Sequence, residues 1–130
     1  MSANLDLVRS IYADWERGDF SSVQWADPEI EYVIVDGPAP GKWTGPPGLR
    51  DRTRSWASAW DHFRVEVDEY RELDDGRVLV LTRGSGRGRS SGLEVAAKSA
   101  DVFHLRDGRV TRFLVYYDRA HALADLGLEE

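Results

Sequence analysis

The sequence of 130 residues contains no cysteine, and its lysines are limited to Lys42 and Lys98. The absence of cysteine excludes disulfides, thiolate chemistry and a cysteine-based metal site. Histidine occurs only at His62, His104 and His121, and this spacing matches no metal-binding motif. We therefore expect a protein that works with neither a metal nor a cofactor.

Long apolar segments are also missing, since no run approaches the roughly 20 residues that a membrane helix needs. The first residues lack the basic segment and apolar block of a secretory signal, so we expect a cytoplasmic protein without membrane contact. The net charge is −6 and the isoelectric point about 5.1, which argues against nucleic acid as a partner. The arginine-rich segment 83–89 is interpreted as a solvated hairpin loop, with a phosphate or RNA site as the alternative.

The chain length and a hydrophobic share of 42% are typical of one domain, which we place over residues 1–130. Apolar residues at helical spacing predict helices over residues 4–17, 19–25, 48–62 and 118–127. Alternating residues predict strands over residues 29–35, 63–73, 77–85, 93–106 and 109–117. The Gly- and Pro-rich segment 36–47 predicts a loop, which Trp43 packs over the mouth of a cavity.

Long antiparallel strands twist, and with helices on one side they curl around those helices and leave a hollow. We therefore predict an α+β fold in which a curved antiparallel sheet wraps around the N-terminal helices as a cone with an internal pocket. The convex face of such a sheet points away from the helices, and Val102 and His104 are expected to lie on it. A mixed apolar and polar face of this kind favours a homodimer through the convex side of the sheet.

Several motifs follow one another in a fixed order: WERGD at residues 15–19, WADPEIEY at 25–32, FHLRDGRV at 103–110 and the ending ALADLGL at 122–128. This series resembles the SnoaL-like branch of the nuclear transport factor 2 (NTF2-like) superfamily from end to end. The resemblance implies the cone-shaped fold and its pocket. It does not imply one reaction, because the superfamily includes polyketide cyclases, a ketosteroid isomerase, epoxide hydrolases, dehydratases and proteins without known chemistry.

Two catalytic sets of this superfamily can be compared with the sequence. Resemblance to ketosteroid isomerase implies a tyrosine in the first helix, a base aspartate on the first strand and a strand aspartate that donates to an oxyanion. Counting along the motifs places these positions at Ile11, Tyr32 and Asp101, so one of the three is retained. Resemblance to limonene-type epoxide hydrolases implies an Asp-Arg-Asp set, and none of it is retained. Its positions fall on Gly84, Gly86 and Val115.

Resemblance to polyketide cyclases implies an acid–base carboxylate on the strand before an Asp-Gly turn, and Asp101 occupies that position. Asp101 shares strand parity with Phe103 and Leu105, the inward side. An inward carboxylate without a partner is costly to ionise, which raises its pKa and suits it to proton transfer. Two alternatives are that Asp101 pairs with an arginine such as Arg83, or that a bulge turns it to solvent. Asp118 is interpreted chiefly as the N-cap of the last helix.

Aromatic residues from several elements converge on the predicted hollow, although core packing explains any single ring as well. Together they favour a pocket for a flat, apolar or aromatic ligand. The predicted substrate-binding residues are Tyr12, Trp15, Trp43, Trp56, Trp60, Arg83, Phe103, Val115 and Tyr117.

The first hypothesis from these residues is a cofactor-independent cyclase- or isomerase-type enzyme acting on a carbonyl compound. Asp101 transfers a proton in this hypothesis, while Tyr32 and Tyr117 hydrogen-bond the substrate. The alternative is a non-catalytic ligand-binding or scaffold homodimer that uses the same pocket.

Overall fold

The computed structural model describes residues 2–19, 23–37, 40–74 and 76–128, and only the backbone of residues 52, 53 and 55–57. The chain order is α1 (Ala3–Glu16), β1 (Ala26–Ile34), β2 (Gly41–Thr44), α2 (Pro46–Ser58), β3 (Trp60–Asp74), β4 (Arg77–Gly88), β5 (Glu94–Arg106), β6 (Arg109–Tyr116) and α3 (Arg119–Asp125). Of the predicted helix 19–25, residues 20–22 lie outside the described residues, and the stretch 23–25 forms a turn.

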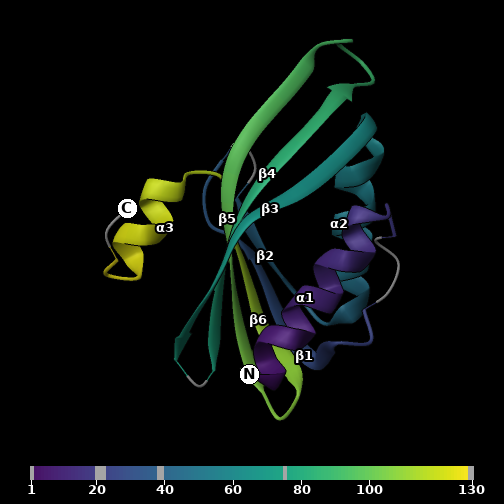
Figure 1. Cartoon of the computed structure of the whole chain (residues 1–130). Helices are drawn as coiled ribbons and strands as arrows, with labels where there is room; N and C mark the ends of the chain where they lie inside the picture. The colour runs from purple at the N-terminus through teal and green to yellow at the C-terminus, as the bar shows by residue number, and fades with distance from the viewer. Residues whose placement is uncertain (1, 20–22, 38–39, 75, 129–130) are drawn as a thin grey trace.

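The six strands form one sheet in the order β2-β1-β6-β5-β4-β3. The sheet curves, with α1 and α2 on its inner side and α3 on the opposite side (Figure 1). This confirms the predicted α+β fold with a curved sheet around the N-terminal helices. Four strand pairs are antiparallel, of which the three between β3, β4, β5 and β6 were expected, whereas β1 and β6 run parallel. No hairpin links these two strands, so the turn signals of the sequence left their relative direction open.

The segment predicted as a loop over residues 36–47 contains a short strand, and that prediction was wrong for its second half. β2 pairs antiparallel with β1 and forms the edge of the sheet, where Gly and Pro nearby are tolerated. Trp43 lies opposite Tyr32, with ring centroids 5.7 Å apart. It packs against the edge of the core and is not among the residues that line the cavity.

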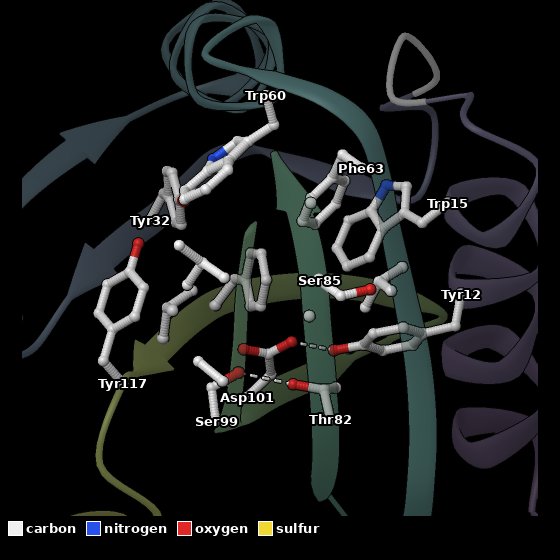
Figure 2. A pocket seen from close by; sticks show the side chains of 17 residues that line it. Tyr12, Trp15, Tyr32, Trp60, Phe63, Thr82, Ser85, Ser99, Asp101 and Tyr117 are labelled. Atoms are coloured by element: carbon white, nitrogen blue, oxygen red, sulfur yellow. Dashed lines mark hydrogen bonds between the residues drawn. The ribbon is translucent and has the colours of Figure 1, made fainter. Parts of the chain in front are cut away.

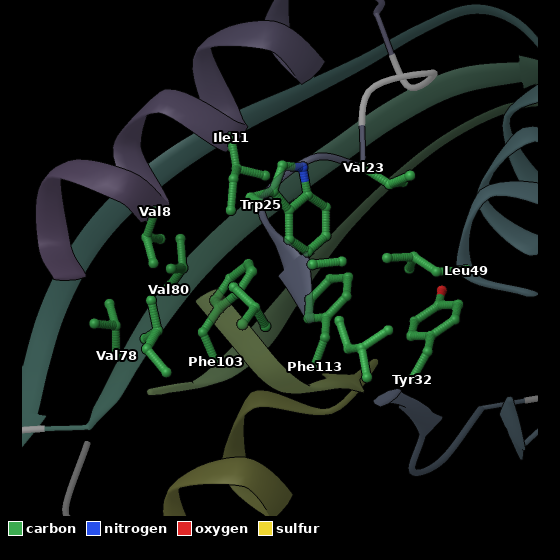
Figure 3. Packing of buried hydrophobic residues seen from close by; sticks show 14 of the residues in the cluster. Val8, Ile11, Val23, Trp25, Tyr32, Leu49, Val78, Val80, Phe103 and Phe113 are labelled. Atoms are coloured by element: carbon green, nitrogen blue, oxygen red, sulfur yellow. The ribbon is translucent and has the colours of Figure 1, made fainter. Parts of the chain in front are cut away.

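The helix α1 is favoured by suitable residues at both of its ends and by an apolar stripe along one side. The Ser2 hydroxyl caps its first turn by accepting from the Leu5 N–H at 3.2 Å. Gly18, with a φ of 84°, ends the helix in a conformation that glycine adopts without strain. The stripe Val8, Ile11, Tyr12 and Trp15 is buried against the inner face of the sheet. Figure 3 shows Val8 and Ile11 of this stripe directed toward the cluster that contains Phe103 and Phe113 of the strands.

The helix α3 covers part of the outer face of the sheet. Asp118 accepts from the N–H groups of Ala120 and His121, which confirms its predicted capping role. Ala122 and Leu123 of α3 are buried in a second cluster that includes Val102. Val102 is therefore covered by the chain's own helix, which removes it from the predicted dimer surface. The homodimer itself stays a prediction.

Within the ranges that the structure covers, no helix combines the length and the apolar character needed to cross a membrane.

Candidate functional site

A cavity of about 260 Å³ lies between α1 and the inner face of the sheet. Most of its surface is apolar, and aromatic rings contribute much of the wall (Figure 2). Its lining residues are Tyr12, Trp15, Tyr32, Trp60, Phe63, Val65, Thr82, Gly84, Ser85, Gly86, Val95, Ala97, Ser99, Asp101, Phe113, Val115 and Tyr117. A concave, mostly apolar pocket with a few polar groups is typical of small-molecule sites.

Asp101 is the ionisable carboxyl group in this lining. It is central on β5, opposite Val80 of β4 and Val115 of β6, and only 8% of its surface is exposed. The Tyr12 hydroxyl donates a hydrogen bond to its Oδ2 atom (Figure 2). The sheet therefore holds the carboxyl inward, and the alternative in which a bulge turns it to solvent was wrong.

The pKa of Asp101 is raised to about 7, because burial penalises the charged carboxylate. The hydrogen bond from Tyr12 acts in the opposite direction and lowers this pKa. No arginine, lysine or histidine is among the lining residues that the structure describes. Burial and the neighbouring Asp101 hold the pKa of Tyr12 well above its ordinary range, so its hydroxyl remains a donor at neutral pH.

Arg83 was predicted either to bind the substrate or to pair with Asp101, and its position contradicts both predictions. Its side chain is exposed and forms ion pairs with Asp68 at 2.6 Å and Glu66 at 3.2 Å. Arg83 lies one position along β4 from Thr82, which lines the cavity, so strand alternation places it on the outer face.

The structure brings most of the other predicted residues together. Seven of them line the cavity: Asp101, Tyr32, Tyr12, Trp15, Trp60, Val115 and Tyr117. Phe103 does not, because it is fully buried behind the wall, stacked on Phe113 at 4.7 Å between ring centroids. Trp43 lies at the sheet edge, and the side chain of Trp56 is outside the described part of the chain. None of these placements tests a role in binding or catalysis.

Sequence reasoning missed a pair of hydroxyl groups in the cavity. Thr82 and Ser99 face each other across β4 and β5, with their side-chain oxygens 2.7 Å apart. Ser99 shares strand parity with Asp101, and this parity was a signal that the sequence offered. The cross-strand partner Thr82 required the register of β4 and β5, which the glycine-rich turn between them does not reveal.

Tyr12→Phe is expected to raise the pKa of Asp101 above its present value of about 7, because the hydrogen bond that lowers this pKa is lost. Titration of the Asp101 carboxyl carbon by ¹³C NMR would measure it. Tyr70→Phe is the matched control, since the Tyr70 ring contacts Tyr12 edge-on at 6.0 Å but does not reach the carboxyl. An unchanged or lowered pKa in Tyr12→Phe would contradict the assigned hydrogen bond.

The curved sheet, the helices on its inner side and the partly open cavity define an α+β pocket protein with the NTF2-like fold. The model of the SnoaL-like domain family matches residues 8–113, and the chain therefore belongs to this family. This confirms the resemblance seen in the sequence. No curated protein matches the chain.

Solved structures with the same fold cover nearly the whole chain. An NTF2-like protein of Burkholderia thailandensis has a TM-score of 0.81 at 22% identity, covering 97% of this chain and 98% of that one. TerC, co-crystallised with polyporic acid, has a TM-score of 0.77 at 22% identity, with 96% and 98% covered. A candidate polyketide cyclase of Pseudomonas putida has a TM-score of 0.73 at 15% identity, with 95% and 97% covered. At these identities the likeness shows the fold alone.

The structure places a tyrosine next to the helix position that the resemblance to ketosteroid isomerase implied. Counting along the sequence placed the helix tyrosine at Ile11, but Tyr12 is the residue whose hydroxyl reaches Asp101. Ile11 packs into the apolar core instead. The hydroxyl that contacts Asp101 therefore lies one position from the residue that the count indicated.

Proposed function

We propose that this protein is a cofactor-independent cyclase- or isomerase-type enzyme that transfers a proton next to the carbonyl group of a neutral, apolar or aromatic compound. The observation that carries the proposal is the buried Asp101 carboxyl, with a pKa of about 7, at the polar end of an aromatic cavity. A general base works best when its pKa lies near the operating pH. The lack of a cation in the described lining favours a neutral ligand over an acidic one.

The proposed step begins with the ionised carboxylate of Asp101. It takes a proton from the carbon next to the carbonyl, and the C–H electron pair becomes the enolate. In an isomerisation, the protonated Asp101 returns this proton to another carbon of the enolate. In a cyclisation, the enolate carbon attacks a second carbonyl of the same molecule, and the proton goes to the new alkoxide. Tyr32 and Tyr117 line the cavity with Asp101 and are proposed to hydrogen-bond the substrate.

Exchange of carbon-bound hydrogen for solvent deuterium tests this step without knowledge of the final product. Wild type in D₂O is expected to accelerate exchange next to the carbonyl in at least one of a panel of bicyclic and tricyclic aromatic ketones, followed by ¹H NMR. Asp101→Asn is expected to lose this acceleration by about a hundredfold or more. Arg83→Gln, on the outer face, is the control and should exchange at the wild-type rate.

A second candidate function is ligand binding without turnover. It is favoured because Asp101 is the single carboxyl group among the described lining residues. The position that the resemblance to ketosteroid isomerase implies for the base aspartate holds Tyr32. Trp15 and Trp60 line the cavity, so a bound aromatic ketone is expected to quench their fluorescence. Quenching without catalysed exchange would replace the enzyme proposal with this one. Exchange that survives in Asp101→Asn would instead contradict the role of Asp101 as the proton-transfer group.

A further inference from the structure

The strand β5 extends beyond its neighbour β6 and leaves one of its edges open. Its pairing with β6 begins at Ala100, whereas its pairing with β4 continues out to Glu94. Residues 94–98 are exposed, and in Figure 1 this part of β5 forms the outer rim of the sheet. Among the described residues, the exposed large apolar side chains are Leu93 and Val95, with exposed fractions of 66% and 43%. Both lie at this rim.

The hydrogen-bond phase of β5 determines which backbone groups the open edge presents. The Gly88 N–H donates to the Leu93 carbonyl at 3.0 Å. Hydrogen-bonded and non-hydrogen-bonded pairs alternate in an antiparallel ladder, so Val95 and Ala97 direct their backbone groups to β4. Glu94, Ala96 and Lys98 therefore direct theirs to the open edge. An edge of this kind is a template for pairing with another strand.

The side chains at this edge are complementary to a second copy of themselves. When two β5 edges pair antiparallel around a two-fold axis at Ala96, Glu94 lies opposite Lys98 of the second copy. The same register joins the free N–H and carbonyl groups of the two strands. A two-fold axis at Val95 or at Ala97 would join the same backbone groups. It would place Glu94 or Lys98, respectively, opposite Ala96, so that neither charge meets an opposite one. Charge thus selects a single register.

We propose that a second copy of this chain docks on the β5 edge at residues 94–98 and forms a two-fold symmetric dimer with a continuous sheet. Val95 and Ala97 both line the cavity, so the pairing places Val95 of one copy beside Ala97 of the other along the cavity rim. The dimer thereby covers exposed apolar surface at the mouth of both cavities. This differs from the dimer expected from the sequence, which used the convex face that α3 partly covers. The inference does not depend on any chemistry at Asp101.

Charge reversal at the edge gives the first test, by sedimentation equilibrium of the full chain. Glu94→Lys and Lys98→Glu each place like charges opposite each other twice in the dimer, and each is expected to weaken dimerisation about tenfold. An equimolar mixture of the two variants restores both opposite-charge pairs and should form heterodimers with about wild-type affinity. Arg71→Gln is the control, because Arg71 pairs with Glu69 at 2.7 Å on β3, at the opposite edge of the sheet, and its replacement should leave the dimer unchanged.

Cysteine cross-linking gives the second test, since the chain has no native cysteine. In Ala96→Cys the two new thiols meet at the axis, where directly opposed Cα atoms are about 5.5 Å apart and within disulfide range. In Lys98→Cys they are separated by about 13 Å or more and should not cross-link. A wild type that stays monomeric up to about 100 µM would overturn the proposal. A dimer that neither charge reversal weakens, or that cross-links equally in both variants, would overturn it too.

Discussion

Asp101→Asn is expected to be more stable than the wild type at pH 8, although it removes a hydrogen-bonded side chain from the interior. The pKa of Asp101 rises from an ordinary 3.8 to about 7 on folding, so the folded state holds this proton more tightly than the unfolded state does. Unfolding then releases a proton, and a rising pH favours unfolding. The stability that the protonated carboxyl contributes is complete below pH 4 and is lost as the pH rises through about 7.

The size of this effect follows from the two pKa values. A rise from 3.8 to about 7 corresponds to on the order of 4 kcal/mol of unfolding free energy. Asparagine has nearly the same shape, its amide oxygen can accept from Tyr12, and it does not ionise. The stability difference between the variant and the wild type should therefore move in favour of the variant by up to about 4 kcal/mol between pH 4 and pH 8.

Urea unfolding of both proteins across this pH range would measure the difference. Asp107→Asn is the matched control, because it makes the same chemical change at an exposed position in the turn after β5, outside the cavity. An Asp101→Asn variant that is less stable by the same amount at every pH would show that Asp101 is ionised throughout. It would also remove the carboxyl that the proposed proton transfer requires.

Phe103→Ala is expected to lower the unfolding free energy by about 3–5 kcal/mol, the range found for buried Phe truncations. Phe103 is fully buried, stacks on Phe113 with an interplanar angle of 13°, and contacts the Tyr12 ring edge-on at 5.8 Å. Truncation would leave a void at the centre of the core and would remove the support of the tyrosine that holds Asp101. Urea unfolding at a fixed pH would measure the loss.

Phe63→Ala is the control for the loss of unfolding free energy in Phe103→Ala. Phe63 lines the cavity and is only partly buried, so its truncation enlarges an existing space and should cost less than half as much. The sequence suggested that Phe103 contacts the substrate. Equal losses of unfolding free energy in the two variants would contradict the buried position of Phe103. They would indicate that Phe103 lines the cavity, as the sequence suggested.

Much of the fold was predictable because local patterns and tertiary packing agree. The stripe from Val8 to Trp15 predicted α1, and the alternation around Val65 predicted a strand whose inward side chains pack against the core. Segment 41–44 was missed because its glycine and proline neighbours are typical of loops, and only pairing with β1 makes it a strand. The site was half predictable: parity along β5 pointed Asp101 inward, whereas the partner Tyr12 depended on the rotation of α1 about its axis.

By itself, the sequence determined the family, the three helices α1, α2 and α3, most of the strands and the inward direction of Asp101. These elements depend on periodicities of 3.6 and 2 that a chain carries locally. The tertiary structure alone decided which groups meet. The contact between Tyr12 and Asp101 spans 89 positions, and the Thr82–Ser99 pair depends on a strand register. It also decided that Arg83 turns outward and that burial raises the pKa of Asp101, since charge and desolvation depend on neighbours that only the folded chain brings together.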